Sequence, residues 1–176
     1  MLTDFARDSL FSTAWFGLMS MVWFGWAQED PPRSWRVWLG IGSTVGVLVA
    51  LAFGFLVARN WAEPTALDGR YPLFGVLVAV EVVAAGAGCW LLHMRGADTW
   101  MAWWVAVVVA AHFVPLAWLL RDPGMAVVGA VQLLVLVALV GRLRRRGRTT
   151  SAPVGAFMGS TLLGSALVAA TVALTA

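Results

Sequence analysis

The chain has 176 residues, of which 61% are apolar and only 12% are charged, and its mean hydropathy is +0.83. Soluble domains are about half apolar and a quarter charged, so this composition excludes a soluble globular fold of this size. All twelve basic residues are arginine and Cys89 is the only cysteine, which excludes lysine Schiff bases, Gly-Lys phosphate loops, internal disulfides and paired-thiol motifs.

The apolar residues form unbroken runs of about twenty, enough for a helix to cross a hydrocarbon layer of roughly 30 Å. They do not alternate with polar residues as the strands of an outer-membrane barrel would. Helices are then the remaining structure in which the backbone N–H and C=O groups are all hydrogen-bonded within lipid. We therefore predict an all-α transmembrane bundle in the cell membrane, with residues 1–176 as a single integral membrane domain. About six spans are expected, at residues 10–26, 37–57, 72–92, 99–120, 125–140 and 153–174.

The first predicted span follows a short stretch that contains Asp4, Arg7 and Asp8. A signal peptide begins with a basic region, whereas this stretch is net acidic. We expect the span to be retained. Removal after a segment such as 25–27, which ends in alanine, stays open as an alternative.

Polar connectors separate the predicted spans. The stretch 59–70 is the longest, and we interpret it as a solvated connector in preference to a lid. Asp98 and Asp122 are placed to cap the helices that follow them, and Pro123 would occupy a first helical position. The short turns at these sites predict that the third, fourth and fifth spans pack as antiparallel neighbours.

Arginine is distributed unequally between the two predicted membrane faces. Four arginines lie on the face that holds the N-terminus and eight on the other, five of them in one predicted loop: Arg142, Arg144, Arg145, Arg146 and Arg148. The positive-inside rule then places both termini outside and this loop in the cytoplasm, against anionic lipid headgroups. This topology explains the pI of about 10.4 without a nucleic-acid partner.

Tryptophan and small residues follow two further patterns. All eleven tryptophans precede Met125 and most lie near span ends, which predicts interfacial anchoring; an aromatic cage at Trp100, Trp103 and Trp104 is the alternative. Small residues at four-residue spacing predict close helix packing within the chain, with a homo-oligomer contact as the alternative: Gly42, Gly46, Ala50 and Gly54, then Gly155 and Gly159.

Three strongly polar side chains lie inside the predicted spans: Glu81, His112 and Gln132. The helical rise places all three about 12 to 14 Å below the same membrane face. Because tight turns connect their spans, we expect them to share one layer as a ligand or proton site. A purely structural trio that fixes helix register is the alternative.

Pro115 follows His112 by three residues and removes the helical donor of the Ala111 carbonyl, which predicts a kink and a free acceptor beside the imidazole. A metal is not expected, because Glu81 and His112 are too few ligands for zinc. His93 lies about 20 Å or more from His112 in depth, so the two cannot clamp one haem. No cofactor is predicted.

The segment from His112 to Ala117 reads His-Phe-Val-Pro-Leu-Ala. Here the chain resembles a group of small polytopic bacterial membrane proteins that share a His-Phe-x-Pro-Leu-Ala segment late in a span. The resemblance covers His112 to about Val140. That group has no established activity, so the resemblance implies no substrate or cofactor, and it marks only His112 and Pro115 as positions of interest.

These observations favour a small transporter-like or solute-binding membrane protein with a small-molecule ligand at Glu81, His112 and Gln132. One alternative is a membrane-embedded acid–base enzyme that acts on a lipid or isoprenoid, with Glu81 as general acid and His112 as its partner. Another is an accessory subunit without chemistry of its own. The shape of a cavity at Glu81 would distinguish these classes.

Overall fold

The computed structural model describes residues 3–175, which form six long helices and no strand. All six are long and apolar enough to cross a membrane, so the chain is an all-α, multi-pass membrane protein as predicted. Two short 3-10 helices, η1 (Arg33–Trp35) and η2 (Asp98–Trp100), precede the second and fourth long helices. In chain order the long helices are α1 (Ala6–Ala27), α2 (Arg36–Arg59), α3 (Tyr71–Met94), α4 (Met101–Leu119), α5 (Pro123–Arg146) and α6 (Ser151–Thr175).

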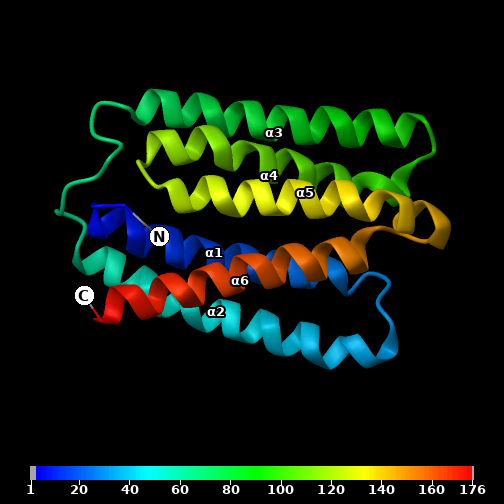
Figure 1. Cartoon of the computed structure of the whole chain (residues 1–176), viewed down its shortest axis with the longest axis horizontal. Coiled ribbons are helices and arrows are strands. Elements are labelled where there is room, and N and C mark those ends of the chain that lie inside the picture. Colours follow the sequence, from blue (N-terminus) through cyan, green and yellow to red (C-terminus); the bar gives the residue numbers. More distant parts are fainter. Residues whose placement is uncertain (1–2, 176) are drawn as a thin grey trace.

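The long helices form two groups of three (Figure 1). In one group α1 packs against both α2 and α6, and in the other α4 packs against both α3 and α5, which confirms the antiparallel contacts expected from the short turns. The groups meet where α6 contacts α4 and α5. Both labelled ends of the chain lie at the same end of the bundle, as an even number of spans requires (Figure 1).

Glycine allows α1 to approach its neighbours closely. A Cβ atom on Gly17 of α1 would lie 2.8 Å from the carbonyl oxygen of Gly46 in α2. The ring of Phe24 lies against Gly42 of α2 on one side and Gly159 of α6 on the other, each within 3.0 Å of the position that a Cβ atom would take. The small-residue pattern therefore serves helix packing within the chain at Gly42, Gly46, Gly155 and Gly159, as predicted, but not at Gly54, which has open space beside it.

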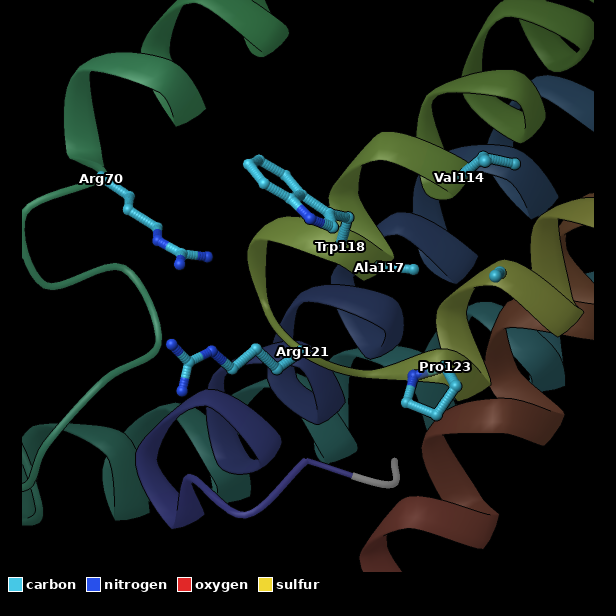
Figure 2. Close-up of a pocket in the computed structure, with 7 residues that line it drawn as sticks. Arg70, Val114, Ala117, Trp118, Arg121 and Pro123 are labelled. Carbon is cyan, nitrogen blue, oxygen red and sulfur yellow. The ribbon is translucent and has the colours of Figure 1, made fainter.

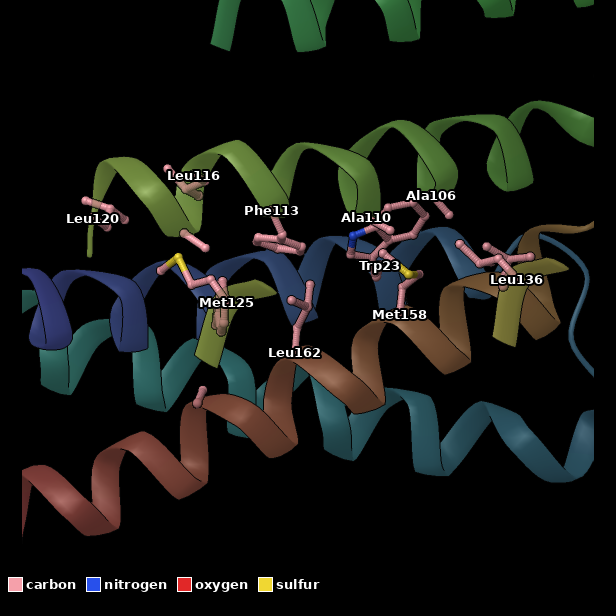
Figure 3. Packing of buried hydrophobic residues seen from close by; sticks show 14 of the residues in the cluster. Trp23, Ala106, Ala110, Phe113, Leu116, Leu120, Met125, Leu136, Met158 and Leu162 are labelled. Atoms are coloured by element: carbon pink, nitrogen blue, oxygen red, sulfur yellow. The ribbon is translucent and has the colours of Figure 1, made fainter. Parts of the chain in front are cut away.

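The buried core lies where the two groups meet (Figure 3). Phe16 of α1 and Phe113 of α4 pack edge to face with ring centroids 5.5 Å apart. Met125 of α5 and Met158 and Leu162 of α6 complete this region, each at most 2% exposed. Aromatic and thioether side chains fill such irregular spaces well.

α5 is longer than the predicted fifth span, which ended at residue 140. The helix continues to Arg146, with Leu143 only 4% exposed, and ends at Gly147 in the left-handed conformation with φ 59°. The predicted arginine-rich loop is therefore wrong in part, since only residues 147–150 connect α5 to α6. Arginine and leucine are good helix formers, so the helix outlasts the apolar run. The side chain of Arg146 lies outside the described residues, and the others are exposed: Arg142, Arg144, Arg145 and Arg148.

The two predicted caps have different outcomes. The Asp122 carboxylate accepts a hydrogen bond from the Gly124 backbone N–H at 2.9 Å, and Pro123 begins α5, as predicted. Asp98 makes no side-chain cap; its Oδ1 lies 3.0 Å from Nδ1 of His93. That cap prediction was wrong because His93, at the end of α3, reaches the carboxylate across the turn.

The connector between α2 and α3 is fixed on the first turn of α1. The Asp8 carboxylate accepts hydrogen bonds from the Thr65 hydroxyl at 2.6 Å and from the Ala66 N–H at 2.7 Å. The Arg7 guanidinium donates to the carbonyl oxygen of Trp61 at 2.7 Å. These bonds favour a fixed connector over a mobile lid.

Candidate functional site

Glu81 of α3 and His112 of α4 face each other across the contact between their helices. Glu81 Oε1 lies 3.5 Å from His112 Nδ1, and the two side chains are only 19% and 13% exposed. The structure therefore brings together the two ionisable residues that the sequence placed at equal depth. Intramembrane carboxyl and imidazole groups are costly to bury singly, and pairing relieves this cost.

Trp104 fixes the register of α3 against α4. Its indole N–H donates a hydrogen bond to the carbonyl oxygen of Ala84 at 3.0 Å, and its ring occupies the space that a side chain on Gly88 would need. α3 has no fully buried residue, and α4 is the long helix with which it makes its main contact. The Trp104 contact and the Glu81–His112 pair are therefore the polar attachments of α3 to α4.

The aromatic cage considered for the tryptophan cluster does not form. Trp103 donates its indole N–H to the Leu136 carbonyl oxygen at 3.1 Å, toward α5, whereas Trp104 is directed toward α3. Trp100 packs edge to face on Trp103 with centroids 5.8 Å apart. These side chains join helices instead of enclosing a ligand.

His112 has a second contact through the same nitrogen. Its Nδ1 lies 3.2 Å from the Val109 carbonyl oxygen, one turn earlier in α4. A proton on Nδ1 can thus be directed to a backbone carbonyl or toward Glu81. The free carbonyl predicted beside the imidazole is that of Ala111, but the imidazole contacts Val109 instead. Pro115 lies inside α4 with its side chain exposed, and it does not line the cavity described below.

Gln132 does not join this pair. It is 0% exposed, and its amide nitrogen donates to the Thr161 hydroxyl of α6 at 2.8 Å; that hydroxyl donates in turn to the Met158 carbonyl oxygen. Among the described residues, no hydrogen-bond partner faces Gln132 Oε1. The predicted trio is wrong in this respect. Equal depth does not fix helix rotation, and α5 turns Gln132 toward α6.

A cavity of about 330 Å³ lies beside the Glu81–His112 pair, between α1, α3 and α4. Glu81 and His112 are the two ionisable side chains among its lining residues. Phe113 and Leu162, which belong to its wall, are visible in Figure 3. Apolar side chains supply most of the remaining surface, including Phe11, Trp15, Met19, Phe74 and Val78.

Three of these lining residues form a row that sequence reasoning missed. Phe11, Trp15 and Met19 recur every four residues on α1, so they lie along one face of the helix. The rings of Phe11 and Trp15 stack with centroids 6.2 Å apart, and each residue is almost half exposed. The spacing alone indicates an apolar stripe; it does not distinguish a cavity wall from a lipid-facing surface.

A second hollow of about 180 Å³ adjoins the first and shares Phe11, Ser12, Phe74 and Leu120 with it. It is also lined by Arg7, Asp8 and Tyr71, at the end of the bundle that holds the N-terminus. Arg7 donates a hydrogen bond to the Tyr71 hydroxyl at 2.9 Å. The two hollows therefore lie next to each other along α1, one at the Glu81–His112 pair and the other at the end of the bundle that holds the N-terminus. The charges of Arg7 and Asp8 were the sequence signal for this second hollow.

The pair can exchange a proton and can bind a polar group from the cavity, because a carboxyl and an imidazole offer both donors and acceptors. Within residues 3–175 the structure groups no three His, Cys, Asp or Glu side chains as metal ligands. Comparison of the chain with protein-family models, curated proteins and solved structures finds no match to any of them.

Proposed function

We propose that the protein binds a largely apolar, membrane-dissolved small molecule between α1, α3 and α4, with one polar group of that molecule at Glu81 and His112. The observation that carries this proposal is the apolar cavity of about 330 Å³ with its single ionisable pair. Ligand sites are commonly about 300 to 1,000 Å³, mostly apolar, and contain a few convergent polar groups.

The second hollow, beside the first, favours a solute-binding or transporter-like role. The two adjoining hollows lie along α1, one at the pair and the other at Arg7 and Tyr71, and we propose that a ligand moves between them. The exposed Phe11 and Trp15 line the same route and offer an apolar surface for entry from lipid. Binding at Glu81 and passage along this route would form one pathway.

An acid–base enzyme is the second candidate, favoured by the contacts of the imidazole. His112 Nδ1 lies near both Glu81 Oε1 and the Val109 carbonyl oxygen, so the imidazole is oriented beside a carboxyl group in an apolar environment. Glu81 would act as general acid toward a lipid or isoprenoid, and His112 would return the proton. This role requires substrate conversion in addition to binding.

Mass spectrometry of small molecules that co-purify with the protein tests the proposal. Val78 lines the cavity, so Val78→Trp should fill it and remove the bound compound. Val82 on the same helix is 64% exposed and outside the cavity, which makes Val82→Trp the matched control. Retention of the same compounds by both variants would contradict the binding site.

A second pair of variants tests the polar group and separates the candidates. Glu81→Leu should reduce the compound, whereas Gln132→Leu, which removes a buried polar group outside the cavity, should not. Incubation of the isolated compound with wild-type protein then shows whether its mass or structure changes. Conversion that needs Glu81 supports the enzyme, and binding without conversion supports the solute-binding role. If the Glu81 variant keeps the compound and full cellular function, the pair is structural.

A further inference from the structure

A further candidate site lies on the outside of the bundle, between the residue before α3 and the turn from α4 to α5, at the end that holds the N-terminus. It is a hollow of about 530 Å³ lined by Arg70, Arg121 and Trp118, with Val114, Ala117, Pro123 and Ala126. Figure 2 shows the Arg70 and Arg121 side chains extending from opposite sides toward the same space. This hollow does not include Glu81 or His112.

Arg70 and Arg121 bring positive charge to the hollow, and neither is in an ion pair given for the described part of the chain. The ion pairs that the described residues form are His93–Asp98, His112–Glu81 and Arg148–Asp30. The neighbouring Asp122 is 1% exposed and caps α5, so its carboxylate is turned inward. Two guanidinium groups therefore face one hollow with donors available for an anion.

Aromatic rings hold these guanidinium groups in place. The Arg70 guanidinium carbon lies 5.3 Å from the centroid of the Trp118 ring, and that of Arg121 lies 6.0 Å from the Phe5 ring. Arg121 also has φ 52°, an uncommon conformation for a residue other than glycine. This left-handed residue ends α4, where the Asp122 N–H donates to the Ala117 carbonyl oxygen at 2.9 Å.

The hollow continues from the arginines along an apolar strip. Val114 and Trp118 of α4 are 51% and 66% exposed, and Ala126 of α5 lies beside them in the lining. Val114 and Arg121 are seven positions apart, about 10 Å at the helical rise, enough for the first part of an acyl chain. A soluble phosphate would use the arginines but would leave this strip uncovered.

We propose that the hollow binds an anionic phospholipid, with a phosphate between Arg70 and Arg121 and an acyl chain along Val114, Ala117 and Ala126. Trp118 then lies at headgroup depth, where its amphipathic ring is favoured. Arginine matches phosphate geometry through its planar array of donors. This lipid site is at the opposite end of the bundle from the arginines of α5.

Native mass spectrometry of the full chain in detergent tests the site with phosphatidylglycerol and phosphatidylcholine. Each arginine near a membrane surface contributes about a fivefold change in affinity for an anionic lipid, so Arg70→Gln with Arg121→Gln should weaken phosphatidylglycerol binding about 25-fold. The control pair is Arg59→Gln with Arg95→Gln, which removes the same charge from two exposed arginines outside the hollow; Arg59 likewise lies over an aromatic ring, Phe55. An equal loss in the control would overturn the site.

Two further measurements test the acyl-chain half of the site. Ala126→Phe leaves both arginines intact and fills the strip, so it should also weaken phosphatidylglycerol binding; unchanged affinity would overturn the proposed chain position. Soluble glycerol phosphate at millimolar concentration should not displace the lipid. Displacement would show a site for free phosphate and would overturn the lipid proposal. Unaltered thermal unfolding of each variant shows that the fold is kept.

Discussion

Substitution of Glu81 and substitution of His112 should lower the free energy of unfolding by different amounts. After Glu81→Leu, the imidazole of His112 keeps its contact with the Val109 carbonyl oxygen at 3.2 Å. After His112→Leu, the described residues offer Glu81 no other hydrogen-bond or ion-pair partner within reach. The His112 substitution should therefore be the more costly of the two.

The distance between the two side chains sets the size of the expected loss in free energy of unfolding. Two unit charges 3.5 Å apart would interact by about 5 kcal/mol at an effective dielectric of about 20, and desolvation removes much of that gain. A buried group left without its partner costs about 1 to 3 kcal/mol. We expect His112→Leu to cost about 2 kcal/mol, Glu81→Leu about 1 kcal/mol, and the double variant less than their sum by at least 1 kcal/mol.

The assay is reversible unfolding in bicelles for the wild type, both single variants and the double variant. Leucine cannot form new hydrogen bonds, so the cycle isolates the coupling between the pair. A parallel cycle with Glu81→Leu and Gln132→Leu is the control and should be additive, because Gln132 bonds to Thr161. Additivity within about 0.5 kcal/mol in the first cycle would refute the contact. A larger cost for Glu81→Leu than for His112→Leu would refute the role of the Val109 carbonyl.

Three further predictions concern packing, the connector and topology. Gly46→Ala should destabilise the fold by about 1 to 3 kcal/mol in bicelle unfolding, because its Cβ would meet α1, whereas Gly54→Ala, with open space beside it, should change stability by less than about 0.5 kcal/mol; equal effects would contradict the packing. Asp8→Ala should release the connector between α2 and α3 and increase its cleavage by protease, whereas Glu63→Gln, exposed in that connector, should not; unchanged cleavage would mean that other contacts hold it. Tags at both termini should react with reagents outside intact cells while cysteines introduced at 142–148 are protected, and the reverse labelling would invert the orientation.

The sequence predicted well those features of the fold that depend on residues close together in the chain. The runs of apolar residues locate all six helices, and Asp122 with Pro123 defines the start of α5 through atoms only two residues apart. Asp98 does not form the predicted cap, because a competing partner, His93, lies just across the turn. The end of α5 was also misplaced, since hydropathy reports where a chain leaves lipid and not where its helix ends.

Which residues meet in the candidate site depends on the rotation of each helix about its own axis. The depth of a residue in the membrane does not determine this rotation. The rise per residue placed Glu81, His112 and Gln132 in one layer, and the structure joins the first two and separates the third. The rotation of α3 is set in part by Trp104, whose indole reaches a backbone carbonyl that every residue possesses. No residue pattern identifies such an acceptor, so neither this contact nor the cavity beside it was predictable.

The position of α1 between α2 and α6 has a consequence for biogenesis. One side of α1 is covered as soon as α2 follows it, but the other side, including the Trp23 carbonyl oxygen and one edge of the Phe24 ring, packs on Gly155 and Gly159 near the start of α6. About 130 residues must be synthesised between these partners, and non-local contacts of this kind form late. The apolar face of α1 therefore stays in contact with lipid or the insertion machinery until the last span enters the membrane. Docking of α6 then completes the bundle and, through Leu162, the wall of the cavity.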